Sequence, residues 1–173
     1  DLLEKILDAR PDLWQAWSIV IQQMATLNRL EEAHALARDA TQRFPLLAKI
    51  WVDLAEICQA LENSEGRLEA LQQAVAVAPG WSLPARELAE ALEEADESDN
   101  ALAVLERTVK RAPIDPFAHG FLAERLWEAG RSREALDRAK HAVRLEPGYD
   151  WAWHVVPAWA ERMELPDVPI ELA

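Results

Sequence analysis

Apolar residues recur along this chain at two spacings, a short helical one and a long one of 34 residues. In residues 116–149 a first apolar stripe holds Leu122 and Leu126, and a second, beyond a polar turn, holds Leu136, Ala139, Ala142 and Val143. Such i, i+3, i+4, i+7 spacing is typical of amphipathic helices. The segment therefore predicts two helices joined by a short turn.

The same stripes return in every 34-residue segment. One position is always large and aliphatic: Val20, Leu54, Leu88, Leu122 and Val156. Prolines repeat with the same period, at Pro11, Pro45, Pro79, Pro113 and Pro147. Proline ends a helix because it has no N–H to donate, and a 34-residue period is typical of stacked helix–turn–helix units.

The prolines divide the chain into one array of repeats. We expect four full repeats, flanked by a partial repeat at 1–13 and a divergent partial repeat at 150–173: 14–47, 48–81, 82–115 and 116–149. Because the chain begins in the middle of a repeat, we interpret it as a piece of a longer array.

Helix starts are also marked in the sequence. Asp115 before Pro116 is a strong start signal, since aspartate caps the free N–H groups and proline suits the first helical position. Three serines, also 34 residues apart, are predicted to cap the second helices: Ser64, Ser98 and Ser132. Pro157 is predicted to kink or end the last helix.

These positions resemble the tetratricopeptide repeat (TPR) family. The clearest repeat is the fourth, where small residues, a turn glycine and a closing proline match the family pattern: Ala123, Gly130, Ala135, Ala142 and Pro147. An aromatic residue expected early in the first helix is present as Trp17, Trp51 and Trp153, whereas Ala85 and His119 replace it. The resemblance implies an all-α fold, an α-solenoid in which antiparallel helix pairs stack into a right-handed superhelix.

The family resemblance also implies where a partner binds. In that family the first helices of successive repeats line a concave groove that holds an extended peptide or a partner helix. The corresponding positions here are acidic in the middle and aromatic toward the C-terminus: Arg86, Glu87, Glu90, Glu94, Phe117, Gly120, Phe121, Glu124, Trp127 and Trp151.

Gly120 lies between Phe117 and Phe121 on this face. It is predicted to leave a notch that another chain can approach closely. An alternative remains open, in which Trp151 and the last helix cover Phe117 and Phe121 as packing between repeats.

Charge narrows the class of partner. The net charge of −13 repels phosphate groups, so we expect neither nucleic acid nor a membrane as partner. A protein or peptide with apolar anchors and basic residues suits the acidic strip better. The single cysteine, Cys58, excludes an internal disulfide, and with no apolar run of membrane-spanning length it favours a cytoplasmic location.

The sequence holds no pattern typical of catalysis. It has no phosphate-binding glycine loop, no serine nucleophile motif and no metal-binding His-Glu-x-x-His pattern. We therefore expect no enzyme activity, no cofactor and no metal. The favoured function is a non-catalytic protein-interaction scaffold. Two alternatives remain: a substrate-docking or regulatory arm of a larger enzyme, such as a glycosyltransferase or peptidase, and a module that self-associates through its terminal helices.

Overall fold

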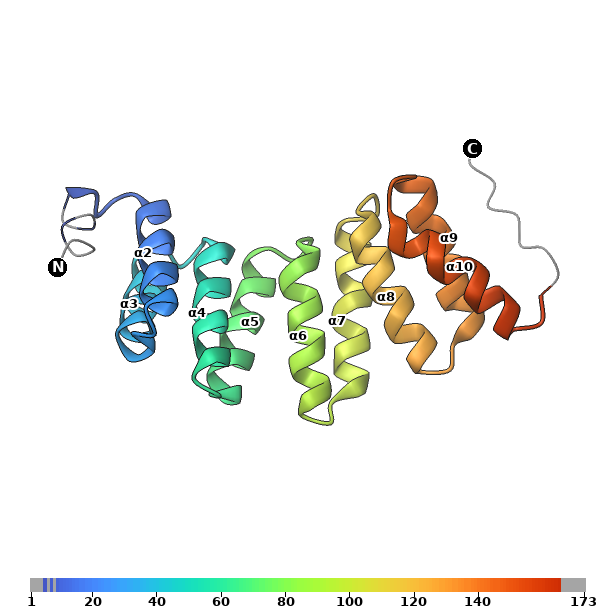
Figure 1. Ribbon diagram of the computed structural model, residues 1–173, viewed down its shortest axis with the longest axis horizontal. Helices are drawn as coiled ribbons and strands as arrows, with labels where there is room; N and C mark the ends of the chain where they lie inside the picture. The colour runs from blue at the N-terminus through green and yellow to red at the C-terminus, as the bar shows by residue number, and fades with distance from the viewer. Residues whose placement is uncertain (1–4, 6, 8, 166–173) are drawn as a thin grey trace. The chain divides into compact units, whose positions relative to one another are not determined.

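The computed structural model describes Lys5, Leu7 and residues 9–165, and parts of both partial repeats lie outside these residues. Within residues 9–165 the chain forms helices and turns and no strand (Figure 1). The helices are α2 (Trp14–Thr26), α3 (Leu30–Arg43), α4 (Ala48–Ala60), α5 (Ser64–Val77), α6 (Ser82–Glu94), α7 (Ser98–Arg111), α8 (Pro116–Glu128), α9 (Ser132–Leu145) and α10 (Asp150–Arg162).

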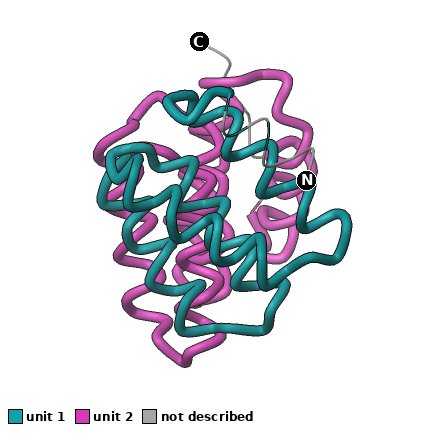
Figure 2. The backbone as a smooth tube through the Cα atoms, turned by 90° about the vertical axis from the view of Figure 1, so that its left-hand side faces the viewer, with its two compact units in different colours: residues 1–79 teal, residues 80–173 magenta. Residues whose placement is uncertain are grey.

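The chain divides into two compact units, residues 1–79 and residues 80–173 (Figure 2). In the first unit α2 packs on α3 and α4 on α5, and the two first helices, α2 and α4, are in contact. In the second unit α6 packs on α7, α8 on α9, and α6 contacts α8. Each full 34-residue repeat thus contains one pair of helices joined by a tight turn, the stacked helix pairs of an all-α solenoid.

Packing within each unit follows the two spacings of the sequence. The large aliphatic position of the first helices is buried in every repeat: Val20, Leu54, Leu88, Leu122 and Val156. Facing positions on the second helices carry fully buried alanines, such as Ala40, Ala74 and Ala142. Small residues let the helix axes approach closely, and the large side chains then fill the grooves between them.

The helix starts differ in part from expectation. The Oδ1 atom of Asp115 accepts hydrogen bonds from the backbone N–H groups of Phe117 (2.9 Å) and Ala118 (3.3 Å), which confirms this cap. The prediction that serines cap the second helices is wrong, because each serine is the first residue inside its helix: Ser64, Ser98 and Ser132. The N-cap position falls one residue earlier, where Asn63 Oδ1 accepts from the N–H of Gly66 at 3.0 Å.

Pro157 does not end its helix. Helix α10 continues from Asp150 to Arg162 with Pro157 inside it.

The turn after each first helix holds one residue with a positive φ angle, again at a 34-residue spacing: Asn28, Glu62, Asp96, Gly130 and Glu164. A left-handed residue at this position reverses the chain after each first helix.

Candidate protein-binding surface

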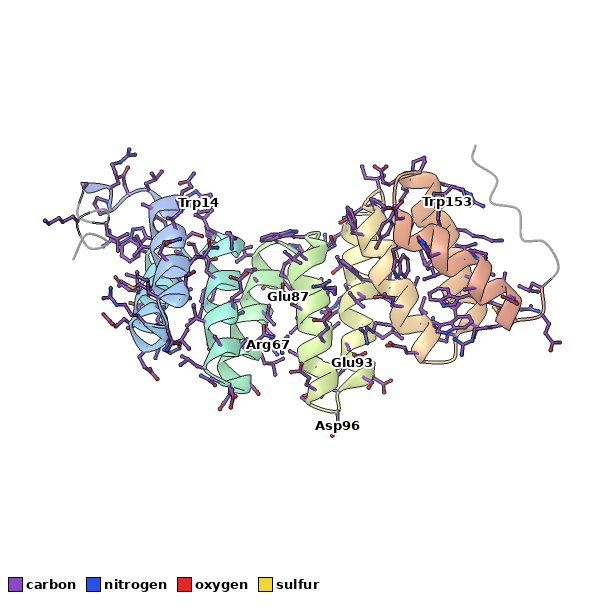
Figure 3. The ribbon with its side chains drawn as sticks, in the orientation of Figure 1. Trp14, Arg67, Glu87, Glu93, Asp96 and Trp153 are labelled. Atoms are coloured by element: carbon purple, nitrogen blue, oxygen red, sulfur yellow. The ribbon has the colours of Figure 1, made fainter. Side chains whose placement is uncertain are left out.

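The predicted binding residues of the second unit come from its three first helices, α6, α8 and α10. Within this unit α6 contacts α8, and α10 packs against α9. Residues separated by three and four positions share one helix face, so the predicted residues lie along one face of α6 and one face of α8. Figure 3 labels Glu87 and Glu93 on α6 and Trp153 on α10.

A series of ring contacts joins α8 to α10. Phe117 meets Tyr149 edge-on with centroids 4.9 Å apart, and Tyr149 stacks on Trp151 at 5.4 Å. Trp151 meets the edge of Trp159 at 6.0 Å, and Trp159 stacks on Trp127 at 4.6 Å with an interplanar angle of 3°. These aromatic residues therefore pack on one another to a large extent.

The notch predicted at Gly120 is filled by the chain itself. Gly120 is buried, and a Cβ atom added there would lie 2.6 Å from the Tyr149 hydroxyl oxygen. Tyr149 stands just before α10, so its side chain reaches back onto α8. The interpretation of Gly120 as a point of approach for a partner is wrong, because the glycine makes room for Tyr149.

Trp127 is also engaged within the chain. It is half-buried, with Trp159 on one ring face and the guanidinium carbon of Arg162 5.7 Å from its centroid. The sequence placed Trp127 on the groove by its helical phase alone. The last helix, whose packing the phase does not reveal, covers much of it.

The sequence left open whether Phe117 and Phe121 face a partner or are covered by the last helix, and the structure shows partial cover. Phe117 contacts Tyr149 and still exposes 48% of its surface. Phe121 is half-buried, and the guanidinium of Arg86 lies 5.2 Å from its ring centroid. Arg86 Nε is in turn 3.4 Å from Glu90 Oε1. Trp151 of the last helix stacks on Tyr149, which contacts Phe117, so this region is covered only in part.

The carboxylates of the surface differ in environment. Glu87 and Glu90 are half-buried and Glu94 is exposed. Burial raises the pKa of the half-buried Glu124 carboxyl, although the charge of Arg125 and a hydrogen bond with the Trp151 side chain act in the opposite direction. Burial, reinforced by the charge of Glu124, also raises the pKa of Tyr149 to about 12. The Tyr149 hydroxyl is therefore neutral at physiological pH.

An ion pair that the sequence did not indicate links α6 to α8. Arg125 Nη1 lies 2.6 Å from Glu93 Oε2 and 2.6 Å from Glu128 Oε2. Arg125 and Glu93 are partly shielded from water, which strengthens such a bond relative to a fully exposed one. The pair helps to hold α6 and α8 in register.

A second feature missed by sequence reasoning is a repeated hydrogen bond to the prolines. The ring nitrogen of the early aromatic position bonds the carbonyl oxygen of the proline six residues before it: Trp17 to Pro11 (3.1 Å), Trp51 to Pro45 (2.9 Å), His119 to Pro113 (2.9 Å) and Trp153 to Pro147 (2.7 Å). His119 thus replaces tryptophan while keeping the ring nitrogen. The two 34-residue series, of aromatics and of prolines, were the available signal.

The bond to Pro113 identifies the tautomer of the neutral His119 ring. Its Nε2 atom carries the hydrogen, because a carbonyl oxygen can only accept, and Nδ1 is left buried without a partner among the described residues. His141 lies next to it, with ring centroids 4.5 Å apart. Burial lowers the pKa of His119, and the charges of His141 and Arg138 act in the same direction, while the Pro113 bond and Asp115 oppose them.

We expect a loss of stability in mild acid. Because the folded state holds His119 neutral, its contribution is complete above pH 6.5 and is lost as the pH falls through the lowered folded pKa. Urea unfolding at pH 7.5 and pH 5.5 should show a larger drop for the wild type than for His119→Phe, by about 1 kcal/mol. An equal drop in both proteins would contradict this role for His119.

No three histidine, cysteine, aspartate or glutamate side chains among the described residues are grouped as a metal site. None of the helices in the described part of the chain has the length and apolar character needed to cross a bilayer.

Comparison with solved structures identifies the fold. No family model matches the chain, and no curated protein matches it. Among solved structures it is similar to YrrB, described as a TPR protein with an unusual peptide-binding site, with a TM-score of 0.64, 17% identity, and 95% of this chain and 84% of YrrB covered.

It is also similar to TTC0263, a thermophilic TPR protein in Thermus thermophilus, with a TM-score of 0.68, 20% identity, and coverage of 92% and 88%. The APC/C hetero-tetramer Cut9–Hcn1 matches with a TM-score of 0.68 and 14% identity, over 95% of this chain and 33% of the other. The helix pairs, their 34-residue period and these similarities together show that the chain has the tetratricopeptide-repeat fold.

Proposed function

We propose that this chain is a non-catalytic protein-interaction scaffold that binds an extended peptide on the second unit. The proposed contact surface, here called the aromatic face, consists of Leu83 on α6, Phe117 and Phe121 on α8, and Trp151 on α10. The expected ligand carries apolar anchors and a lysine or arginine.

The observation that carries this proposal is a row of incompletely buried apolar side chains. Leu83, Phe117 and Trp151 occupy the same repeat position, 34 residues apart, on three first helices. Leu83 exposes 39% and Phe117 48% of its surface, and Trp151 is half-buried. Large apolar side chains that remain exposed in a regular row are typical of interaction sites, and aromatic anchors supply much of the affinity at such sites.

Charge supports a basic ligand. Glu90 on α6 and Glu124 on α8 occupy the same repeat position. Each lies seven residues, or two helical turns, after the Leu83 and Phe117 position of the aromatic face. Burial already raises the pKa of Glu124, so a cationic side chain placed there would regain electrostatic energy. The fold supports the same idea, since YrrB is described as having a peptide-binding site. A rigid, preformed face also limits the ordering entropy lost on binding.

A peptide-display selection tests the proposal. Random 12-residue peptides are selected on the full chain, synthesised, and titrated by fluorescence anisotropy. We expect the selected peptides to combine apolar anchors with lysine or arginine. Replacing Leu83 and Phe117 together with serine should weaken binding by roughly tenfold or more, because both anchors would lose apolar contact.

The matched control is Ile114→Ser. Ile114 is 80% exposed in the same unit and lies outside the aromatic face, so its replacement should leave affinity unchanged. Reversing Glu90 and Glu124 to lysine should weaken a basic peptide and lower the salt dependence of its binding. Peptides that bind the serine double variant as tightly as the wild type would contradict the proposal.

A further inference from the structure

The first unit holds a buried carboxylate with one oxygen unsatisfied. Asp53 on α4 is 0% exposed, and its Oδ1 atom accepts from Lys49 Nζ at 2.5 Å and from Gln22 Nε2 on α2 at 3.3 Å. Its Oδ2 atom is buried and has no hydrogen-bond partner among the described residues. Buried polar atoms are paired with protein or water in the great majority of cases, so a donor supplied from outside these residues would stabilise this oxygen.

The surroundings of Asp53 favour a cation as that donor. Glu56 lies three residues later on the same face of α4 and is exposed as a residue. Partial burial of its carboxyl raises the pKa, the charge of Lys49 acts against this, and the charge of Asp53 acts in the same direction as burial. Two carboxylates thus face one ammonium group, and Lys49 is already engaged by Oδ1. The two acidic groups retain an excess of negative charge, and the Asp53 carboxylate is shielded from water.

An exposed apolar side chain shares a face of α2 with Gln22. Ile19 exposes 56% of its surface and stands three residues before Gln22 on α2. Since Ile19 and Gln22 share a helix face, the aliphatic stem of a long basic side chain has apolar surface to cover beside the carboxylates. Gln22 is exposed and its bond is long, so it can move aside for a better donor.

We propose that Gln22, Lys49, Asp53 and Glu56 form a second binding site that takes an arginine side chain of a protein partner. Gln22 moves aside to admit the guanidinium, which donates one hydrogen bond to the otherwise buried Asp53 Oδ2 and a second toward Glu56. The stem of the arginine lies against Ile19. Arginine suits the site better than lysine, because its planar fork of five donors can serve two carboxylates and it is less strongly hydrated. This site does not depend on the aromatic face.

Two matched peptides test the proposal on the full chain. Acetyl-Ala-Ala-Arg-Ala-Ala-amide is compared with the same peptide containing citrulline, which keeps the shape of arginine without its charge. In amide-resolved NMR titrations at low salt we expect the arginine peptide to shift resonances of α2 and α4 and to bind roughly tenfold more tightly than the citrulline peptide.

Two variants locate the contact. Asp53→Asn keeps the size of the side chain and should weaken the arginine peptide by roughly tenfold. Glu65→Gln removes an equal charge from an exposed position of the same unit and should leave binding unchanged. If Asp53→Asn does not fold, Glu56→Gln leaves Asp53 and its bonds in place and should weaken the same peptide.

Equal affinity for the two peptides would overturn the proposal, and so would an Asp53→Asn protein that folds and binds the arginine peptide as the wild type does. Shifts confined to the second unit would also overturn it, while leaving the proposed function of the aromatic face intact. A supporting sign is a lower pKa of Glu56, measured by NMR titration, when the arginine peptide is bound.

Discussion

Replacing Trp127 with alanine is expected to destabilise the second unit by about 2–3 kcal/mol, rather than only to impair partner binding. Trp127 lies 4.6 Å from Trp159 in a nearly parallel stack and is approached by Arg162. Removing a fully buried tryptophan costs about 3–5 kcal/mol, and Trp127 is half-buried. Urea unfolding followed by circular dichroism measures the loss.

A double-mutant cycle tests whether the stack is the cause. Trp127→Ala, Trp159→Ala and the double variant should give a coupling free energy of about 1 kcal/mol, as expected for an aromatic pair in contact. Phe117→Ala on the same helix is the matched control, since Phe117 is more exposed and its replacement should cost less. A Trp127→Ala protein of wild-type stability that fails to bind peptides would instead restore Trp127 as a binding residue.

The fold could be predicted because its two governing patterns are local in the sequence. Prolines at a fixed interval and apolar positions at helical spacing give the number, order and approximate ends of the helices. The turns were less visible. Each needs a left-handed residue, but only Gly130 among the five is the glycine that normally marks such a position; the other four carry side chains there, namely Asn28, Glu62, Asp96 and Glu164.

The candidate site was harder to predict, because its contacts join residues of different repeats. Helical phase assigned Phe117, Phe121 and Trp127 to one face of a single helix, yet it could not show what covers them. That depends on how α10 packs, and α10 brings Tyr149 and Trp159 onto α8. The proline bonds were missed for a similar reason, since each residue series was recognised without the hydrogen bond that connects them.

The buried carboxylate of Asp53 could not be recognised from the sequence either. Its position in the sequence groups it with Glu87 as one of several acidic residues on first helices. Only the packed helices α2 and α4 distinguish it, by burying the carboxylate and leaving one oxygen without a donor among the described residues. A charge count therefore indicates an acidic surface, whereas the structure identifies a carboxylate with an unmet hydrogen bond.

Replacing Gly120 with leucine is expected to destabilise the second unit by about 2–3 kcal/mol. Glycine inside a helix normally costs about 1 kcal/mol relative to alanine, so a larger residue would stabilise α8 if the space beside it were empty. Here an added Cβ lies 2.6 Å from the Tyr149 hydroxyl oxygen and 2.9 Å from a ring carbon. Overpacking of this kind costs typically about 1–3 kcal/mol.

Tyr149 has little freedom to move away, because its ring contacts both Phe117 and Trp151. Shortening it should therefore relieve the clash: Gly120→Leu combined with Tyr149→Ala should be more stable than the sum of the two single changes predicts, by at least about 1 kcal/mol. Ala103→Leu, at an exposed helical position of α7, is the control and should be nearly neutral. A stable Gly120→Leu protein without coupling to Tyr149 would mean that the notch is open to a partner after all.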